Sequence, residues 1–293
     1  MSFRPATWRS SKRTMSDNHQ SAKGPADLAY QLDDFTDGWR EAPPVMLLHG
    51  IAESARAFNG WVPHLARHYS VIRPDLRGHG NSPSVPPGTT LTVAQLADDI
   101  ERLVERLGSK RIHVVGAKLG AQVALELAQR EVPWMATLTL AGVLISPAGA
   151  LGKWMPQWHQ LVDEHGVEGW ARATMPGRMG SALTEAGNEW WIRYMGTTQS
   201  DTVKACFRLI EASGEPARLD RIPCPTQIIA AVKPPTAGAS FSQQPALTEV
   251  NRWAARIPRA RVVELEADSY HIAATHPDAC AAMTAAFIKE QTT

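Results

Sequence analysis

The sequence predicts an α/β protein with a parallel sheet, helices on both faces and one inserted helical segment. Short apolar runs alternate with longer amphipathic runs along most of the chain, which is typical of parallel strands joined by crossover helices. The alternation stops over residues 147–217, where no β-rich run occurs, and then resumes. The 293 residues, 44% of them hydrophobic, are sufficient for a large buried core.

The expected strands are short apolar runs that end in turn residues. Val45–Leu48 is bounded by His49-Gly50, and Val71-Ile72 precedes Pro74-Asp75, so both are predicted to be buried strands entering turns. The full set of expected strands covers residues 28–35, 45–48, 71–72, 111–115, 137–145, 226–232 and 261–265.

The helix expected at residues 91–107 has the clearest pattern, because its apolar residues fall on one face. Thr92 and Gln95 match a capping box at its start, and Gly108 is suited to its end. The remaining expected helices outside the insertion cover residues 58–68, 119–130, 244–257 and 277–289.

These elements predict a division into three parts. Residues 1–24 are polar and basic, without an apolar signal-peptide core, and are predicted to form a disordered tail. Residues 25–146 and 218–293 are expected to form the α/β core, and residues 147–217 a helical cap rich in tryptophan.

Composition excludes several functional classes. The formal net charge is +1, so no positively charged surface for nucleic acid is expected. The sequence contains no run of 18 apolar residues, so no membrane-spanning helix is expected. The three cysteines are odd in number and far apart, which suits a cytoplasmic protein. Metal-ligand clusters and phosphate-binding glycine loops are missing from the sequence, so no cofactor is expected. The expected partner is a small-molecule substrate, and a homodimer remains open.

The strongest chemical signal is the segment VVGAKLGA at residues 114–121. A strand, a tight turn with small residues at 116 and 120, and a helix follow one another, which predicts a nucleophile elbow. Such a turn presents its central side chain to the active site at the start of a helix. The central residue here is Lys118, where a serine hydrolase carries serine.

Three further motifs accompany the elbow in sequence order. His49-Gly50-Ile51 follows a buried strand, the segment PDLRGHGNS forms a glycine-rich turn at 74–82, and SYHI at 269–272 precedes the last helix. Together the four motifs resemble those of the α/β-hydrolase superfamily, in particular its 3-oxoadipate enol-lactonase-like branch. That resemblance implies an eight-stranded, mostly parallel sheet with a helical cap over the pocket. It also implies His271 as the catalytic histidine, and the backbone amides of Ile51 and Leu119 as an oxyanion hole.

The sequence departs from the family pattern at two positions. Lys118 replaces the nucleophilic serine, and the segment AAVKPPTAG places Pro234 where the triad acid is expected. Because no Asp or Glu lies between Asp220 and Glu249, the usual Ser–His–acid triad is predicted to be absent.

The chemistry of lysine narrows the predicted reaction. An amine that attacked an ester would form a stable amide, whereas an amine forms reversible imines with aldehydes and ketones. Burial favours the neutral amine that imine formation needs. The first hypothesis is therefore an enzyme acting on a small apolar or aromatic carbonyl compound, by retro-aldol cleavage or decarboxylation. Lys118 is its imine-forming nucleophile or base, and His271 its general acid/base.

Two alternatives stay open. In the first, the protein hydrolyses an ester, lactone or C–C bond with water activated by His271, while Lys118 orients the substrate. In the second, it is a non-catalytic ligand-binding protein on a hydrolase scaffold.

The substrate pocket is expected to draw on two regions of the chain, the turn after the first buried strand and the cap. Two of the candidate residues have an alternative to lining the pocket. His49 would have a structural role in its turn, and Arg56 would lie exposed in a loop. Adjacent helical residues diverge by about 100°, so one ring of the Trp190–Trp191 pair is expected to pack internally while the other faces the pocket. The candidate lining residues are His49, Glu53, Arg56, Trp154, Trp158, Trp190 and Trp191.

Overall fold

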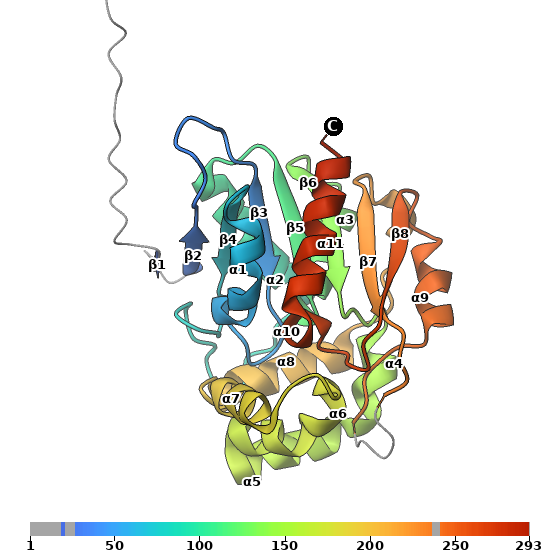
Figure 1. Ribbon diagram of the computed structural model, residues 1–293. Coiled ribbons are helices and arrows are strands. Elements are labelled where there is room, and N and C mark those ends of the chain that lie inside the picture. Colours follow the sequence, from blue (N-terminus) through green and yellow to red (C-terminus); the bar gives the residue numbers. More distant parts are fainter. Residues whose placement is uncertain (1–18, 21–26, 236–240, 293) are drawn as a thin grey trace, which may run out of the picture.

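The computed structural model describes residues 19–20, 27–235 and 241–292 of the chain. Their strands form one sheet of eight strands in the order β1-β2-β4-β3-β5-β6-β7-β8 (Figure 1). Strand β2 (Tyr30–Asp33) is antiparallel to both neighbours, β1 (His19–Gln20) and β4 (Ser70–Pro74). All other neighbouring strands are parallel, namely β3 (Pro44–Leu48), β5 (Ile112–Ala117), β6 (Met135–Ala141), β7 (Thr226–Ala231) and β8 (Ala260–Leu265).

The predicted α/β fold is confirmed, and each of the seven expected strands is present. The strand expected to reach residue 145 ends earlier, at Ala141. The next residue, Gly142, has a φ of +65°, which turns the chain out of the sheet. The tail predicted for residues 1–24 lies outside the described residues except for His19 and Gln20, which pair with β2.

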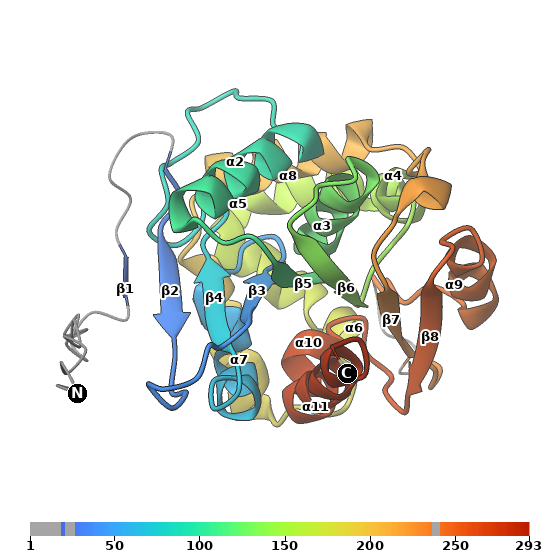
Figure 2. The same cartoon turned by 90° about the horizontal axis from the view of Figure 1, so that it is seen from above.

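Helices cover both faces of the sheet (Figure 2). One face packs against α2 (Val93–Leu107), α3 (Leu119–Gln129) and α9 (Leu247–Ala254). The other face packs against the short 3-10 helix Ala55–Trp61 and against α1 (Val62–Leu65), α10 (Ile272–Thr275) and α11 (Pro277–Glu290). Each layer has its own apolar core, as the alternating sequence predicts.

The helix ends follow local chemistry. The Thr92 hydroxyl accepts from the Gln95 amide at 3.1 Å, and the Gln95 side chain accepts from the Thr92 amide at 3.0 Å. This is the predicted capping box, and Gly108 closes the helix with a φ of +64°. The helix expected over residues 58–68 is instead a 3-10 turn followed by one α-helical turn, with Pro63 in its first turn.

The inserted helices lie across the carboxyl ends of the parallel strands (Figure 1). They have an apolar core of their own, built on Trp158, Trp170 and Phe207. Among the described helices, none combines the length and the apolar character that crossing a membrane requires. The division into core and cap domains at the stated boundaries stays a prediction. The inserted elements are α4 (Pro147–Leu151), a 3-10 turn (Gly152–Trp154), α5 (Met155–Thr174), α6 (Pro176–Met179), α7 (Glu185–Gly196) and α8 (Ser200–Ala212).

The close packing of α3 on β3 predicts that any side chain at position 120 destabilises the protein. A Cβ atom there would lie 2.1 Å from the carbonyl oxygen of Leu48, in the backbone of β3. We expect Gly120→Ala to lower the free energy of unfolding by about 1–3 kcal/mol in urea denaturation. Gly152→Ala is the matched control, because a Cβ at Gly152 meets no atom within 4 Å. Equal stability of the two variants would contradict this packing.

Candidate active site

The turn between β5 and α3 has the geometry of the predicted elbow. Lys118 has a φ of +52° and a ψ of −111°, and α3 begins at the next residue. A Cβ at Gly116 would lie 2.6 Å from the Cα of Ala121, so the strand and the helix meet closely only because position 116 carries no side chain. The strained backbone of Lys118 is held by a hydrogen bond from its amide to the Gly142 carbonyl at 3.2 Å.

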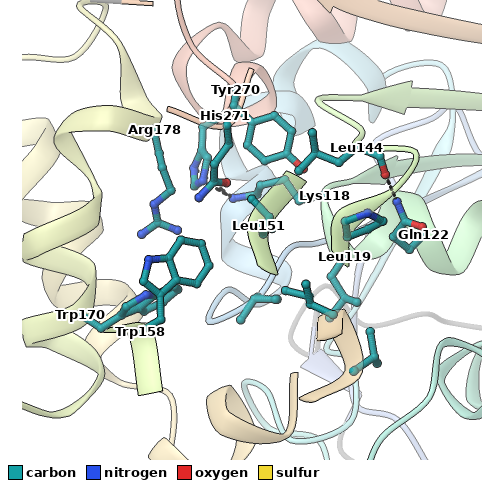
Figure 3. A pocket seen from close by; sticks show the side chains of 15 residues that line it. Lys118, Leu119, Gln122, Leu144, Leu151, Trp158, Trp170, Arg178, Tyr270 and His271 are labelled. Carbon is teal, nitrogen blue, oxygen red and sulfur yellow. Dashed lines mark hydrogen bonds between the residues drawn. The ribbon is translucent and has the colours of Figure 1, made fainter. Parts of the chain in front are cut away.

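The Lys118 side chain is buried at this turn and contacts two titratable groups. Its amine forms an ion pair with Glu53, and its Nζ atom lies 2.8 Å from Nε2 of His271 and 3.0 Å from Nδ1 (Figure 3). The other Glu53 oxygen accepts from the Gly50 amide at 3.0 Å. Only 12% of the Lys118 side chain and 3% of the Glu53 side chain are exposed, so the pair is shielded from water.

Burial sets the protonation of these groups. Burial lowers the pKa of Lys118 to about 8, although the carboxylate of Glu53 opposes this shift. Burial alone would raise the pKa of Glu53, but Lys118 outweighs it and the pKa falls below its usual value. Burial, Lys118 and Arg178 together hold the pKa of His271 well below 6.5. At neutral pH the pair is therefore charged and the imidazole neutral.

His271 is fixed at the start of α10, opposite the elbow. Its backbone amide donates to the Ser269 hydroxyl at 2.9 Å, and that hydroxyl donates to the Arg178 carbonyl at 3.0 Å. Asp268, three residues before His271, accepts from the Ser181 amide at 3.1 Å. The carboxylate beside Lys118 comes from Glu53, in the loop after β3, and not from the segment after β7.

The two residues whose amides are assigned to the oxyanion hole line the same cavity. Ile51 and Leu119 both line the cavity next to Lys118. Within the described part of the chain, neither amide donates to a protein acceptor. Free donors beside the elbow are what an oxyanion hole requires.

A cavity lies between the elbow and the inserted helices. Its wall is mostly apolar, and four titratable groups reach it: Lys118, Arg178, Tyr270 and His271. The residues that line it are Ile51, Lys118, Leu119, Gln122, Leu144, Pro147, Leu151, Trp158, Trp170, Arg178, Leu209, Ile210, Gln243, Tyr270 and His271.

Three of the candidate lining residues lie at cavities beside Lys118. Trp158 lines the large cavity. Glu53 and Trp191 line a smaller one that also reaches Lys118 and His271. Trp191 is buried while 43% of Trp190 is exposed, so the two adjacent rings diverge as expected.

Four other candidates line neither cavity, which corrects the expectation for them. Arg56 is exposed, with its guanidinium 5.6 Å from the centre of the Trp190 ring. Trp154 stacks on Trp158 at 6.1 Å and is not part of the cavity lining. Trp190, the third of these residues, is 43% exposed.

His49 is the fourth, and its ring is fully buried in the turn after β3. The imidazole donates from Nδ1 to the Gly50 carbonyl at 2.7 Å and accepts at Nε2 from the Leu76 amide at 2.9 Å. Both ring nitrogens are therefore used within the fold, and burial lowers the pKa of His49 to about 4. The structural alternative for His49 is the one the geometry supports.

Sequence reasoning missed the four polar residues Gln122, Arg178, Gln243 and Tyr270 of the cavity wall. Tyr270 directly precedes the predicted catalytic histidine, His271, and this position in the sequence could have indicated that it lines the cavity. Arg178 sits in a four-residue helix of the insertion, where no periodicity marks which side faces inward. An arginine in such a segment is usually exposed, and only the tertiary structure shows that this one is buried.

Comparisons with known proteins agree with this geometry. The family described as alpha/beta hydrolase fold matches residues 43–180. The chain is similar to the enol-lactonase from Burkholderia xenovorans LB400, with a TM-score of 0.77 at 21% identity over 92% of this chain and 99% of that one. It is similar to a hydrolase from Pseudomonas aeruginosa PA01, with a TM-score of 0.78 at 27% identity over 93% and 99% of the two chains.

Curated relatives match over shorter stretches. The putative carbamate hydrolase RutD from Escherichia coli O17:K52:H18 is 30% identical over 158 residues, which are 51% of this chain and 53% of that protein. An uncharacterized protein, Rv2715, from Mycobacterium tuberculosis is 37% identical over 86 residues, 29% of this chain and 25% of that protein. The chain thus spans between a quarter and about half of the length of these relatives.

The protein therefore has the fold of the α/β-hydrolase superfamily, with a lysine at the elbow position. One of these similar structures is an enol-lactonase, the branch that the sequence resembles. Its 21% identity to this chain shows only that the fold is shared.

The buried pair predicts a strong energetic coupling between Lys118 and Glu53. Each single variant, Lys118→Met or Glu53→Gln, leaves its partner without a counter-charge, so the double variant is expected to lose less stability than the two singles combined. The coupling energy from urea denaturation is expected to be about 1–3 kcal/mol.

The exposed pair Lys204–Asp163, 2.6 Å apart, is the matched control. For Lys204→Met with Asp163→Asn the coupling is expected to stay below about 1 kcal/mol. Additive effects at Lys118 and Glu53 would show that the two side chains are not paired in solution.

Proposed function

We propose that the protein is a hydrolase of an ester or lactone bond in a small, largely apolar substrate. In this proposal His271 activates the water and Lys118 orients the substrate carbonyl. The observation that carries the proposal is the position of the Lys118 amine, between the Glu53 carboxylate and the His271 imidazole. An amine held as a cation by a buried carboxylate has no lone pair for attack, but it is well placed to polarise a carbonyl.

In the free protein, the Lys118 amine makes a hydrogen bond that a substrate can replace with one of its own. A charged amine has three N–H donors, of which Glu53 and His271 accept two. A substrate carbonyl that accepts the N–H now directed at His271 frees the imidazole lone pair. The amides of Ile51 and Leu119 are then available for the same carbonyl oxygen, as the resemblance to α/β hydrolases implies.

The chemical step follows from the neutral imidazole. His271 takes one proton from water, and the water oxygen forms a bond with the carbonyl carbon. The tetrahedral oxyanion is stabilised by Lys118 and the two amides. When the bond to the leaving oxygen breaks, His271 returns the proton to it. The net change is ester plus water to carboxylic acid plus alcohol, without an acyl-enzyme.

Similar proteins support hydrolysis as the reaction class. The Pseudomonas aeruginosa structure is described as a hydrolase, the Burkholderia structure as an enol-lactonase, and the Escherichia coli relative as a putative carbamate hydrolase. These names describe those proteins, and they assign no role to the lysine at the elbow of this chain. A cytoplasmic location and a homodimer stay predictions.

Imine chemistry at Lys118 is a second candidate function. It is favoured by the pKa of Lys118, which burial lowers to about 8, and by the contact of this amine with the cavity. In that reaction the neutral amine adds to a ketone or aldehyde and releases water, and the imine accepts electrons from the bond that breaks. Glu53 opposes it, because an adjacent carboxylate favours the charged amine.

The pH dependence of kcat/KM separates the two functions. Hydrolysis requires charged Lys118 and neutral His271, so the rate is expected to be flat through pH 6.5–7.5 and to fall about tenfold per pH unit above about 8. Imine formation requires the neutral amine, so its rate would rise through the same range. We expect the rate to fall in this way on a panel of 4-nitrophenyl esters and γ-lactones, with buffer alone as the blank for spontaneous hydrolysis.

Borohydride trapping checks the same assignment independently. Reduction of the protein with carbonyl compounds, followed by peptide mass spectrometry, is expected to leave Lys118 unmodified. A rate that rises from pH 6.5 to about 8 and then levels off, together with a reduced adduct on Lys118, would replace hydrolysis by imine chemistry. Ester turnover that survives His271→Ala would contradict the role given to the imidazole.

A further inference from the structure

The loop after β3 places Glu53 beside Lys118, and a hydrogen bond from this loop reaches the inserted helix α7. The hydroxyl of Tyr194, in α7, accepts from the Ser54 amide at 2.5 Å and lies 2.9 Å from the Ser54 hydroxyl. Both residues are buried, so these contacts are shielded from water. Ser54 directly follows Glu53 in the chain, so Tyr194 holds the backbone from which the Glu53 carboxylate extends.

A second residue of the same loop also packs against the inserted helices. Ala52 has a φ of +58°, a conformation that residues with a side chain rarely adopt and that surrounding contacts must maintain. It is fully buried, and it belongs to the apolar core of the inserted helices. On the other side of the loop, the Ala55 amide donates to the Asp75 carboxylate, after β4, at 2.7 Å. The position of Glu53 therefore depends on the inserted helices as well as on the turn after β4.

Glu53 is the group that favours the charged form of the Lys118 amine. Burial lowers the pKa of this amine, Arg178 lowers it further, and the Glu53 carboxylate opposes both effects. Burial also keeps the nearby histidines neutral by lowering the pKa of each, and the nearby tyrosine neutral by raising its pKa. In the described part of the chain, the titratable groups around the amine other than Glu53 are Arg178, His49, His271 and Tyr270. Displacement of Glu53 therefore leaves only influences that lower the pKa of Lys118.

We propose that Tyr194 is a positioning residue of this site. Through Ser54 it holds the Glu53 carboxylate against the Lys118 amine, and it thereby ties the charged form of Lys118 to the packing of α7 over the loop. Without the hydroxyl, the buried Ser54 amide loses its acceptor, which favours a shift of the loop. The importance of Tyr194 for hydrolysis rests on the proposed function, whereas its effect on the charge of Lys118 does not.

Tyr194→Phe tests this role, because it removes the hydroxyl and keeps the ring. We expect the titration of the Lys118 amine, followed by ¹⁵N-edited NMR, to shift by at least about half a pH unit to lower pH, because Glu53 opposes burial less. The fall of kcat/KM at high pH is expected to move in the same direction. Tyr69→Phe is the matched control and is expected to change neither, since the buried Tyr69 lines neither cavity beside Lys118 and its hydroxyl donates to the Ala285 carbonyl.

A double variant separates positioning from a general loss of stability. With Glu53→Gln already present, Tyr194→Phe is expected to cause no further shift of the Lys118 titration, because the carboxylate through which it acts has been removed. A hydroxyl with a structural role alone would lower the unfolding temperature when removed, and would leave the titration of Lys118 in place.

Two results would overturn the proposal, an unchanged Lys118 titration in Tyr194→Phe and a shift to higher pH. The second would mean that the hydroxyl only excludes water from the amine. Should Tyr194→Phe fail to fold, Ser54→Ala removes the hydroxyl contact from the other side, and a smaller shift to lower pH is expected of it. No shift in that variant would likewise overturn the proposal.

The same measurements distinguish this proposal from the proposed function. A Lys118 titration that moves to lower pH in Tyr194→Phe, in a protein without ester turnover, would retain the positioning role and reject the hydrolase. Ester turnover with an unmoved titration would do the reverse.

Discussion

A lysine can remain charged inside a protein only where a counter-charge and hydrogen-bond acceptors meet its amine, and this constraint organises the centre of the molecule. Lys118 extends from a strained turn into a buried space, and Glu53 lies there to receive it. A Cβ at Gly50 would lie 2.5 Å from Cε of Lys118, so a side chain there would displace the lysine from its present position.

The pairing changes what the elbow does chemically. In an elbow with serine, the side chain gives its proton to histidine and attacks. Here the side chain is itself a donor to the imidazole and to a carboxylate, so nucleophilic attack is suppressed while electrostatic stabilisation is retained. In the proposed hydrolysis the neutral His271 is the base, and Glu53 acts through Lys118 as a positioning residue.

The cavity wall contains two buried cations that differ in their partners. Lys118 is paired with Glu53. Arg178 has no ion pair among the described residues, and its guanidinium lies 4.7 Å from the centre of the Trp170 ring.

The sequence was informative wherever a local rule determines structure. Strand runs ending in turns, the capping box at Thr92 and the small residues at 116 and 120 predicted their elements, because each depends on neighbours along the chain. The same rules placed Lys118 at an elbow. They could not pair it with Glu53, which lies 65 positions away.

Prediction failed for side chains whose orientation depends on tertiary packing. Arg56 and Trp190 pack on each other at the surface, and His49 uses both ring nitrogens within its own turn. Arg178 was missed because a short helix carries no periodicity that marks its inner side. Such positions become visible only when the inserted helices are placed over the sheet.

The charge state of Lys118 tests this account most directly. A ¹⁵N-edited NMR titration of the lysine side chains, with the Lys118 resonance assigned by its loss in Lys118→Arg, measures the pKa of this amine in the intact protein. The account predicts a charged amine at neutral pH that titrates at about 8. Titration at the value of a solvated lysine, 10.5, or a neutral amine at pH 7, would contradict a buried Lys118–Glu53 pair.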